Sequence, residues 1–111
     1  MRLAGEDLSK YIALKITWGK NNAKRRGLDF NLTKQELLDL YEEQKGLCAL
    51  SGLPMTRSSN NSEYSLSIDR IDSESGYTSD NVQLVCWRIN TMKSSLSVEM
   101  FKWWCKVIAK D

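Results

Sequence analysis

The chain has no histidine among its 111 residues and only one proline. Without an imidazole, the usual general base of hydrolytic enzymes and the commonest metal ligand are both excluded. No apolar run approaches the roughly 18 residues that cross a bilayer, and the start MRLAGEDLSK lacks the apolar core of a signal peptide. We therefore expect a cytoplasmic protein with no membrane partner.

Cysteine is also scarce, with Cys48, Cys86 and Cys105 as the whole supply. Three cysteines cannot all pair, and a cytoplasmic setting disfavours disulfides. A closed structural zinc site needs four ligands, usually Cys and His, which this chain does not offer. We interpret the cysteines as reduced thiols, Cys48 and Cys86 as small buried apolar residues, and expect no structural zinc.

Charge is unevenly distributed, although the net charge is only +2. Residues 1–27 contain Glu6 and Asp7 against seven basic side chains, which are Arg2, Lys10, Lys15, Lys20, Lys24, Arg25 and Arg26. Such a cluster is typical either of a phosphate-binding surface or of a solvated helix face, and charge alone leaves both open.

Two helices are expected in residues 1–46. Apolar positions in residues 8–26 are compatible with a helix that ends in KRRG, with Gly27 as the residue after its C-cap. In the next segment Thr33 and Glu36 form a capping box, and the apolar stripe that follows stops at Gly46. Residues 47–55, LCALSGLPM, predict a strand or knuckle followed by a turn.

A hairpin and two more helices are expected in the second half. Residues 64–68 and 82–86 read as antiparallel strands around a polar loop with a turn at Gly76. The segment WRINTMK predicts a short helix, and Ser97 can cap a final one. The length fits one α+β domain, with a helical part (1–46), a hairpin-plus-helix core (47–95) and a C-terminal helix (96–111).

Four polar residues of this core could carry chemistry: Asp69, Arg70, Asn81 and Asn90. A hairpin packed on a helix can bring Asp69 and Asn90 together, and carboxylate and amide oxygens suit magnesium or a similar divalent ion. Other interpretations stay open. Asp69 and Arg70 can form a surface ion pair at a turn, Asn81 can bond its own loop, and Asn90 can make an ordinary polar contact.

The same residues carry a resemblance to the HNH endonuclease family, whose core is a ββα-metal hairpin and helix. Asp69 and Arg70 stand where that family has Asp-His, and Asn81 and Asn90 match its two later positions. The segments CALS (48–51) and CWRI (86–89) resemble its two C-x-x-C pairs, each with only the first cysteine kept. The motifs AKRRGLDFNLT, QKGLCALSGLP and SIDRID extend the likeness to phage-type members over about residues 20–103.

This resemblance implies a metal-dependent endonuclease that hydrolyses phosphodiester bonds of double-stranded DNA, in a bacterial or phage-infected cell. Asp69 and Asn90 would hold Mg²⁺ or Mn²⁺, Arg70 would hold the phosphate, and Asn81 would brace the loop. A set of basic side chains would contact the DNA phosphates: Lys20, Lys24, Arg25, Arg26, Arg88 and Lys93. The oligomeric state is left open.

One departure from the family is serious, because Arg70 replaces the histidine that activates water. A guanidinium stays protonated far above neutral pH and cannot act as a base. Bulk water, the metal, Asp72 or Tyr77 would have to supply the hydroxide, so we expect a weak or nicking enzyme. The alternative is a noncatalytic DNA-binding module that kept the fold after losing its base.

A third hypothesis is a protein-interaction domain that uses the tryptophan-rich C-terminal helix. The four tryptophans, Trp18, Trp87, Trp103 and Trp104, are otherwise expected mostly in the core, with one exposed ring able to stack on a base or sugar.

Overall fold

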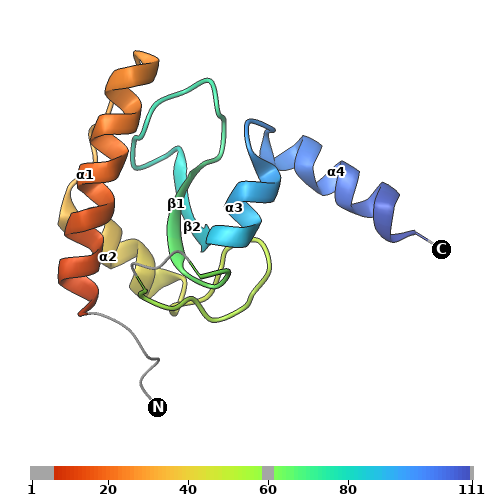
Figure 1. Ribbon diagram of the computed structural model, residues 1–111, viewed down its shortest axis with the longest axis horizontal. Coiled ribbons are helices and arrows are strands. Elements are labelled where there is room, and N and C mark those ends of the chain that lie inside the picture. Colours follow the sequence, from red (N-terminus) through yellow and green to blue (C-terminus); the bar gives the residue numbers. More distant parts are fainter. Residues whose placement is uncertain (1–6, 59–61, 111) are drawn as a thin grey trace.

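The computed structural model describes residues 7–58 and 62–110, which form an α+β fold of four helices and a two-stranded sheet. In chain order the elements are α1 (Leu8–Arg26), α2 (Lys34–Glu43), β1 (Leu66–Arg70), β2 (Val82–Cys86), α3 (Trp87–Lys93) and α4 (Val98–Ala109). The hairpin lies between α1 and α2 on one side and α3 on the other (Figure 1). The expected fold class is confirmed.

The first two helices follow their end signals. Asp7 caps α1, and Gly27 ends it in the left-handed conformation with φ of 68°. The capping box of α2 is present, since the Glu36 amide donates to Thr33 Oγ1 at 3.1 Å and the Thr33 amide donates to Glu36 Oε1 at 2.9 Å. The helix stops before the predicted end at Gly46, because the chain there passes into a turn.

The hairpin pairs Leu66 with Cys86 and Arg70 with Val82 in an antiparallel register. Residues 82–86 form a strand as predicted, whereas β1 begins two residues later than the predicted 64–68. The start moves because Ser65 is bridged to Thr56 and belongs to the preceding turn. Within β1, alternation directs Ser67 and Asp69 to the same face, which is the face that α3 covers.

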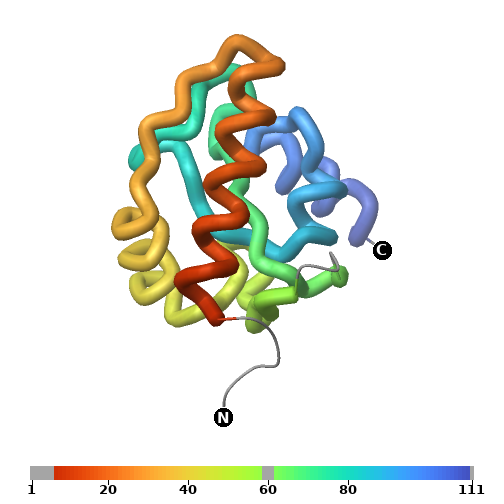
Figure 2. The backbone as a smooth tube through the Cα atoms, turned by 60° about the vertical axis from the view of Figure 1, so that its left-hand side comes forward, coloured from red at the N-terminus to blue at the C-terminus, as the bar shows by residue number. Residues whose placement is uncertain are grey.

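The loop of the hairpin is joined to the segment that follows α1. The Tyr77 amide donates to the Asp29 carbonyl at 2.9 Å, and the Asn31 amide donates to the Tyr77 carbonyl at 2.9 Å. Gly76 is needed at this seam, because a Cβ atom there would lie 2.6 Å from the Asp29 carbonyl oxygen. The seam holds α1 across the hairpin (Figure 2), so that the end of α1 lies near the end of β1.

Three of the four tryptophans lie at the surface, which corrects the expectation that they are mostly core. Trp18, Trp103 and Trp104 are 58%, 51% and 45% exposed. The reason is that Trp18 lines a pocket beside α1, while the other two lie on α4, which projects from the body. The core is instead built by Tyr11, Ile12, Leu37, Met55, Leu66, Leu84 and Val85.

Cys48 and Cys86 are buried, as predicted, and lie next to each other. Burial and the neighbouring Cys48 raise the pKa of the Cys86 thiol to about 11. Burial also raises the pKa of Cys48, but hydrogen bonds from Ser51 and from nearby backbone amides lower it more, so its pKa falls below the usual value. The first residues of the segments CALS (48–51) and CWRI (86–89) therefore meet inside the fold.

Candidate functional site

Four polar side chains meet where α3 covers the hairpin. Ser67 and Asp69 are two residues apart on β1 and share one face of the strand. Asn90 and Lys93 are three residues apart on α3 and share one face of the helix. Because α3 starts directly after β2, these two faces are brought against each other.

Asp69 is buried, with 3% of its side chain exposed, and both of its oxygens have partners. Lys93 Nζ lies 3.1 Å from Oδ1, and Gln83, its partner across the hairpin, donates from Nε2 to Oδ2 at 3.0 Å. Each carboxylate oxygen can accept more than one interaction. Asp69 is therefore fixed in position and retains coordinating capacity.

Asn90 is oriented by its amide nitrogen. Nδ2 donates to Ser67 Oγ at 2.6 Å and to the Ile68 carbonyl at 3.3 Å. No described residue donates a hydrogen bond to the Asn90 side-chain oxygen. Asn90 lines the same pocket as Asp69, so its side-chain oxygen is left available to a ligand bound there.

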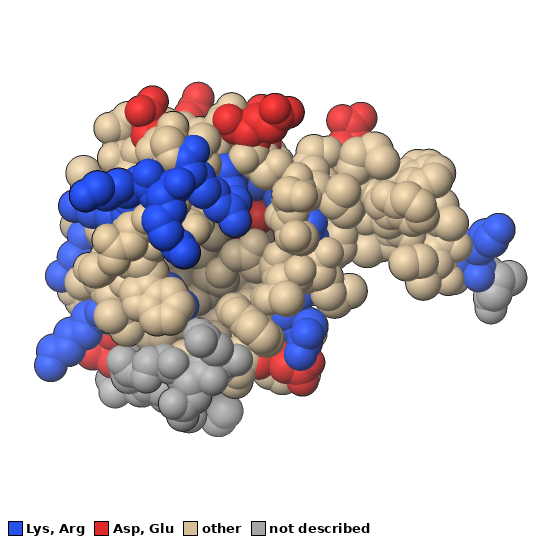
Figure 3. All heavy atoms as spheres, turned by 45° about the horizontal axis from the view of Figure 1, so that its top comes forward, with Lys and Arg blue, Asp and Glu red and all other residues tan. Residues whose placement is uncertain are grey.

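Asp69 and Asn90 line one pocket of about 340 Å³. Its opposite wall is formed by α1, which contributes Lys15, Asn22 and Arg26. Figure 3 shows Lys and Arg side chains gathered beside the hollow on this face. The structure thus brings together an acidic and an amide side chain from distant parts of the chain and places a basic wall opposite them.

The donor set suits a hard divalent ion but is small. Carboxylate and amide oxygens are appropriate ligands, and Mg²⁺ commonly keeps several waters and uses one or two protein groups. Within residues 7–58 and 62–110 no group of three or more His, Cys, Asp or Glu could hold a metal. Most coordination positions would therefore be left to substrate and water, and the Lys93 ammonium would compete with the ion for Asp69.

Arg70 and Asn81 both brace the hairpin loop. Arg70 is 8% exposed, donates from NH1 to the carbonyls of Ser73 and Ser75, and lies over the Tyr77 ring. Asn81 accepts a hydrogen bond from the Asp72 amide at 2.9 Å and donates to the carbonyls of Asp72 at 3.0 Å and Gly76 at 2.9 Å. Arg70 borders the pocket, but its guanidinium is engaged by the loop.

Among the expected DNA contacts, Lys93 has to be corrected. It is fully buried, and its Nζ donates to the Arg70 carbonyl at 2.9 Å besides pairing with Asp69, so no phosphate can reach it. Lys20, Lys24, Arg25 and Arg26 are exposed on the last turns of α1. Arg88 is exposed and forms an ion pair with Glu63 at 3.0 Å.

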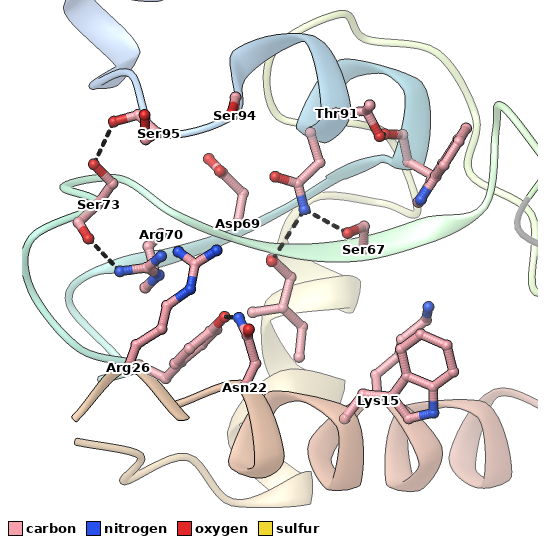
Figure 4. Close-up of a pocket in the computed structure, with 15 residues that line it drawn as sticks. Lys15, Asn22, Arg26, Ser67, Asp69, Arg70, Ser73, Thr91, Ser94 and Ser95 are labelled. Atoms are coloured by element: carbon pink, nitrogen blue, oxygen red, sulfur yellow. Dashed lines mark hydrogen bonds between the residues drawn. The ribbon is translucent and has the colours of Figure 1, made fainter. Parts of the chain in front are cut away.

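Arg26 lines the pocket with its guanidinium unengaged by any described residue, and Figure 4 shows it pointing into the pocket from α1. Lys15 lines the same pocket, with Nζ 5.3 Å from the centre of the Trp18 ring, and burial lowers its pKa. A basic wall thus faces Asp69 and Asn90.

Asp72 and Tyr77, the two side chains considered as a substitute base, both already accept hydrogen bonds, so neither can take a proton from a water in the pocket unless its contacts change. Asp72 is exposed outside the pocket, where its carboxylate accepts from the Glu74 amide and the Ser75 hydroxyl. The Tyr77 hydroxyl accepts from Asn22 Nδ2 at 2.9 Å at the pocket wall.

Sequence reasoning missed Gln83, Ser67 and the burial of Lys93. Two signals were available. The hairpin register places Gln83 opposite Asp69, and helical spacing places Lys93 on the face of Asn90.

Comparison with known proteins links the chain to viral sequences of unstated function. No protein-family model matches. The chain is 37% identical over 90 residues to an uncharacterized protein of Acanthamoeba polyphaga mimivirus, covering 81% of this chain and 15% of that protein. It is 30% identical over 99 residues to an uncharacterized 29.0 kDa protein from the dda-modA intergenic region of Enterobacteria phage T4, covering 89% and 38%. The chain spans less than half of either relative.

The fold is similar to that of a solved nuclease. The rare-cutting HNH restriction endonuclease PacI matches with a TM-score of 0.65 at 23% identity, over 88% of this chain and 76% of that one. At this identity the likeness shows the fold, which is an HNH-like α+β fold. In the described part of the chain, no helix is both long and apolar enough to span a membrane.

Proposed function

We propose that this HNH-like fold is a DNA endonuclease that hydrolyses phosphodiester bonds with a divalent metal ion. Asp69 and Asn90 would hold the ion, Mg²⁺ or Mn²⁺. The observation that carries the proposal is that these two side chains line one pocket opposite the unengaged guanidinium of Arg26. The viral relatives support a setting in an infected host cell.

The side chains around the pocket would fix the reacting groups. Ser67 holds the Asn90 amide, and Gln83 with Lys93 holds the Asp69 carboxylate, so both side chains are positioned before an ion binds. A divalent ion bound there would polarise the phosphodiester and stabilise the departing oxygen.

Arg26 is better placed to bind the scissile phosphate than Arg70. Its guanidinium faces the pocket, whereas that of Arg70 is used by two loop carbonyls. A guanidinium can bind two phosphate oxygens at once. Lys20, Lys24 and Arg25 extend the positive surface along α1 and would contact flanking phosphates of a duplex, which positions the DNA without reading its sequence.

The missing base sets the expected rate. General-base help is typically worth ~10² to 10⁴-fold, and this chain has no imidazole to provide it. Tyr77 borders the pocket, but its hydroxyl already accepts a hydrogen bond from Asn22 Nδ2 at 2.9 Å. We therefore propose a slow nuclease that cuts one strand at each encounter.

One observation favours the alternative of a noncatalytic DNA-binding module. Asp69 is already neutralised by a buried lysine, which gives the carboxylate a structural partner that needs no metal. In that case α1 would still bind DNA, but the pocket would bind no ion.

Nicking of supercoiled plasmid with Mg²⁺ or Mn²⁺ separates the two functions. We expect slow nicking by the natural chain and at least tenfold less by Asp69→Asn, a change that keeps the shape of the side chain. Asp39→Asn removes an exposed carboxylate from α2 and serves as the matched control. Equal nicking by the natural chain and Asp69→Asn would reject the enzyme, and salt-sensitive DNA binding without nicking would establish the binding module.

A further inference from the structure

Helix α4 extends away from the rest of the molecule (Figure 1). The Ser97 hydroxyl accepts a hydrogen bond from the Met100 amide at 3.1 Å and starts the helix. Of the twelve residues of α4, only Phe101 is buried. A helix this short is marginal in water without packing, so the arrangement leaves an apolar helix in need of a partner.

One face of α4 carries an apolar stripe formed by Met100, Trp103, Trp104, Val107 and Ile108. Their spacing places them on one side of the helix. Four of them are exposed, from 45% for Met100 and Trp104 to 79% for Ile108. The two indole rings meet edge to face with centroids 4.9 Å apart. Large contiguous apolar surface of this kind marks an interaction site.

The charged residues of α4 lie outside the stripe in a pattern that is complementary to itself. Lys102 lies on the side of the helix opposite the stripe. Glu99 near the start of the helix and Lys106 near its end are seven residues apart, so they lie along the same edge of the stripe. One edge thus carries a negative charge at one end and a positive charge at the other.

An antiparallel pair of α4 helices would use both features at once. When two identical helices pack antiparallel about a two-fold axis, the same edge of each meets the other, as in antiparallel coiled coils. Glu99 of one copy then lies opposite Lys106 of the second copy, and the pairing occurs twice. A lipid surface would match the apolar stripe and the lysines, but it would leave Glu99 against the head groups.

We propose that α4 is a self-association surface through which two copies of this chain pair antiparallel, stripe against stripe. The interface is small. A tryptophan offers roughly 150–250 Å², and both indoles are about half exposed, so the buried area falls short of the ~1,200–2,000 Å² of a standard interface. The dimer is therefore weak and dependent on concentration, and DNA that holds two copies would favour it.

Sedimentation equilibrium of the full chain over micromolar to millimolar concentrations tests the proposal. We expect the average mass to rise from 12.7 kDa toward twice that value. Trp104→Glu should remove the rise. Glu99→Lys and Lys106→Glu should each raise the dissociation constant roughly tenfold, and the variant that carries both should recover the natural value.

Lys102→Glu is the matched control, because it makes the same charge change as Lys106→Glu on the side away from the stripe. Circular dichroism establishes that each variant keeps its helix content, and recovery in the double variant excludes misfolding as the cause of the single losses. A mass of 12.7 kDa at every concentration would overturn the proposal, as would a dimer insensitive to both reversals. So would binding to vesicles of anionic phospholipid by a chain that stays monomeric.

Discussion

At the scale of single residues, the buried ion pair of Asp69 and Lys93 determines what the site can do. Their side chains are 3% and 1% exposed, so neither charge is hydrated. Removing one partner of such a pair leaves an uncompensated charge and typically costs about 3–5 kcal/mol. Lys93 thus holds Asp69 in place, and it is also the cation beside which a metal ion would have to bind.

Lys93→Met is expected to lower the free energy of unfolding by about 3–5 kcal/mol, because it leaves the buried Asp69 carboxylate without its cationic partner. Mn²⁺ should then raise the melting temperature of the variant by several degrees more than that of the natural chain, since the ion replaces the lost cation. Thermal unfolding with and without Mn²⁺ measures both effects. If the Lys93→Met/Asp69→Asn double variant responds to Mn²⁺ as strongly as Lys93→Met, Asp69 is not a ligand.

The cysteines should differ sharply in reactivity. Cys105 is exposed on α4, whereas Cys48 and Cys86 are buried. The thiolate is the reactive form, and because the pKa of Cys86 is raised to about 11, that thiol stays protonated until the pH approaches this value. Iodoacetamide at pH 8 should give a single adduct on the folded chain and three adducts in urea, as counted by intact mass. A folded Cys105→Ser variant that is still alkylated would contradict this.

From sequence alone, Asp69 and Asn90 could be predicted as site residues, but the hydrogen bonds that hold them could not. The two were identifiable because their residue types and their order in the chain carry the chemistry, whereas their partners Ser67 and Gln83 were missed. Lys93 was assigned to the surface, since lysine is almost never fully buried unless it is paired. Its burial depends on the distance between α3 and β1, which is a tertiary fact. Arg70 was likewise predicted to bind the phosphate, although its guanidinium donates to two loop carbonyls in the structure.

At the scale of elements, local signals located most of the boundaries. Capping at Thr33 and Ser97, Gly27 after α1 and the apolar alternation of residues 82–86 are all short-range features, and all are found in the structure. The start of β1 was misplaced because it depends on the bridge between Thr56 and Ser65, two residues far from the hairpin turn. No local pattern encodes that contact.

Gly76→Ala should disrupt the seam between the hairpin loop and the segment after α1. The new Cβ would lie 2.6 Å from the Asp29 carbonyl oxygen, so the two backbones must separate. We expect a loss of about 1–3 kcal/mol in unfolding free energy, together with weaker DNA binding, because α1 loses its position over β1. Urea unfolding measures the loss, with Ser79→Ala at an exposed loop position as control. A stability equal to that of the control would show that the seam is dispensable.

At the scale of the whole molecule, the proposed DNA affinity would have to come from a local concentration of positive charge, since the net charge is only +2. The exposed residues Lys20, Lys24, Arg25 and Arg26 concentrate positive charge at the end of α1, beside the pocket. Acidic residues elsewhere cancel it in the total but not at that surface.

Replacing Lys20, Lys24 and Arg25 together by Gln should weaken duplex binding and flatten its salt dependence. Each lost phosphate contact lowers the slope of log affinity against log salt by about 0.9, so three contacts would change it by about 2.7. Fluorescence anisotropy across a salt series measures the slope. Lys34→Gln, at an exposed position on α2, should leave it unchanged; an unchanged slope in the triple variant would place the DNA elsewhere.

The exposure of α4 could not be predicted from the sequence. Its apolar spacing is that of any helix that packs on a core, and only the path of the chain after α3 shows that no such packing occurs beyond Phe101.

The pocket draws one wall from α1 and the other from β1 and α3, so the acid and amide are encoded far from their basic counterpart. A chain cut between α2 and β1 would yield two fragments, each of which lacks one wall of the pocket. Under the proposed nuclease function, mixing them would restore plasmid nicking only when they reassemble, which would make strand scission a reporter of fragment complementation.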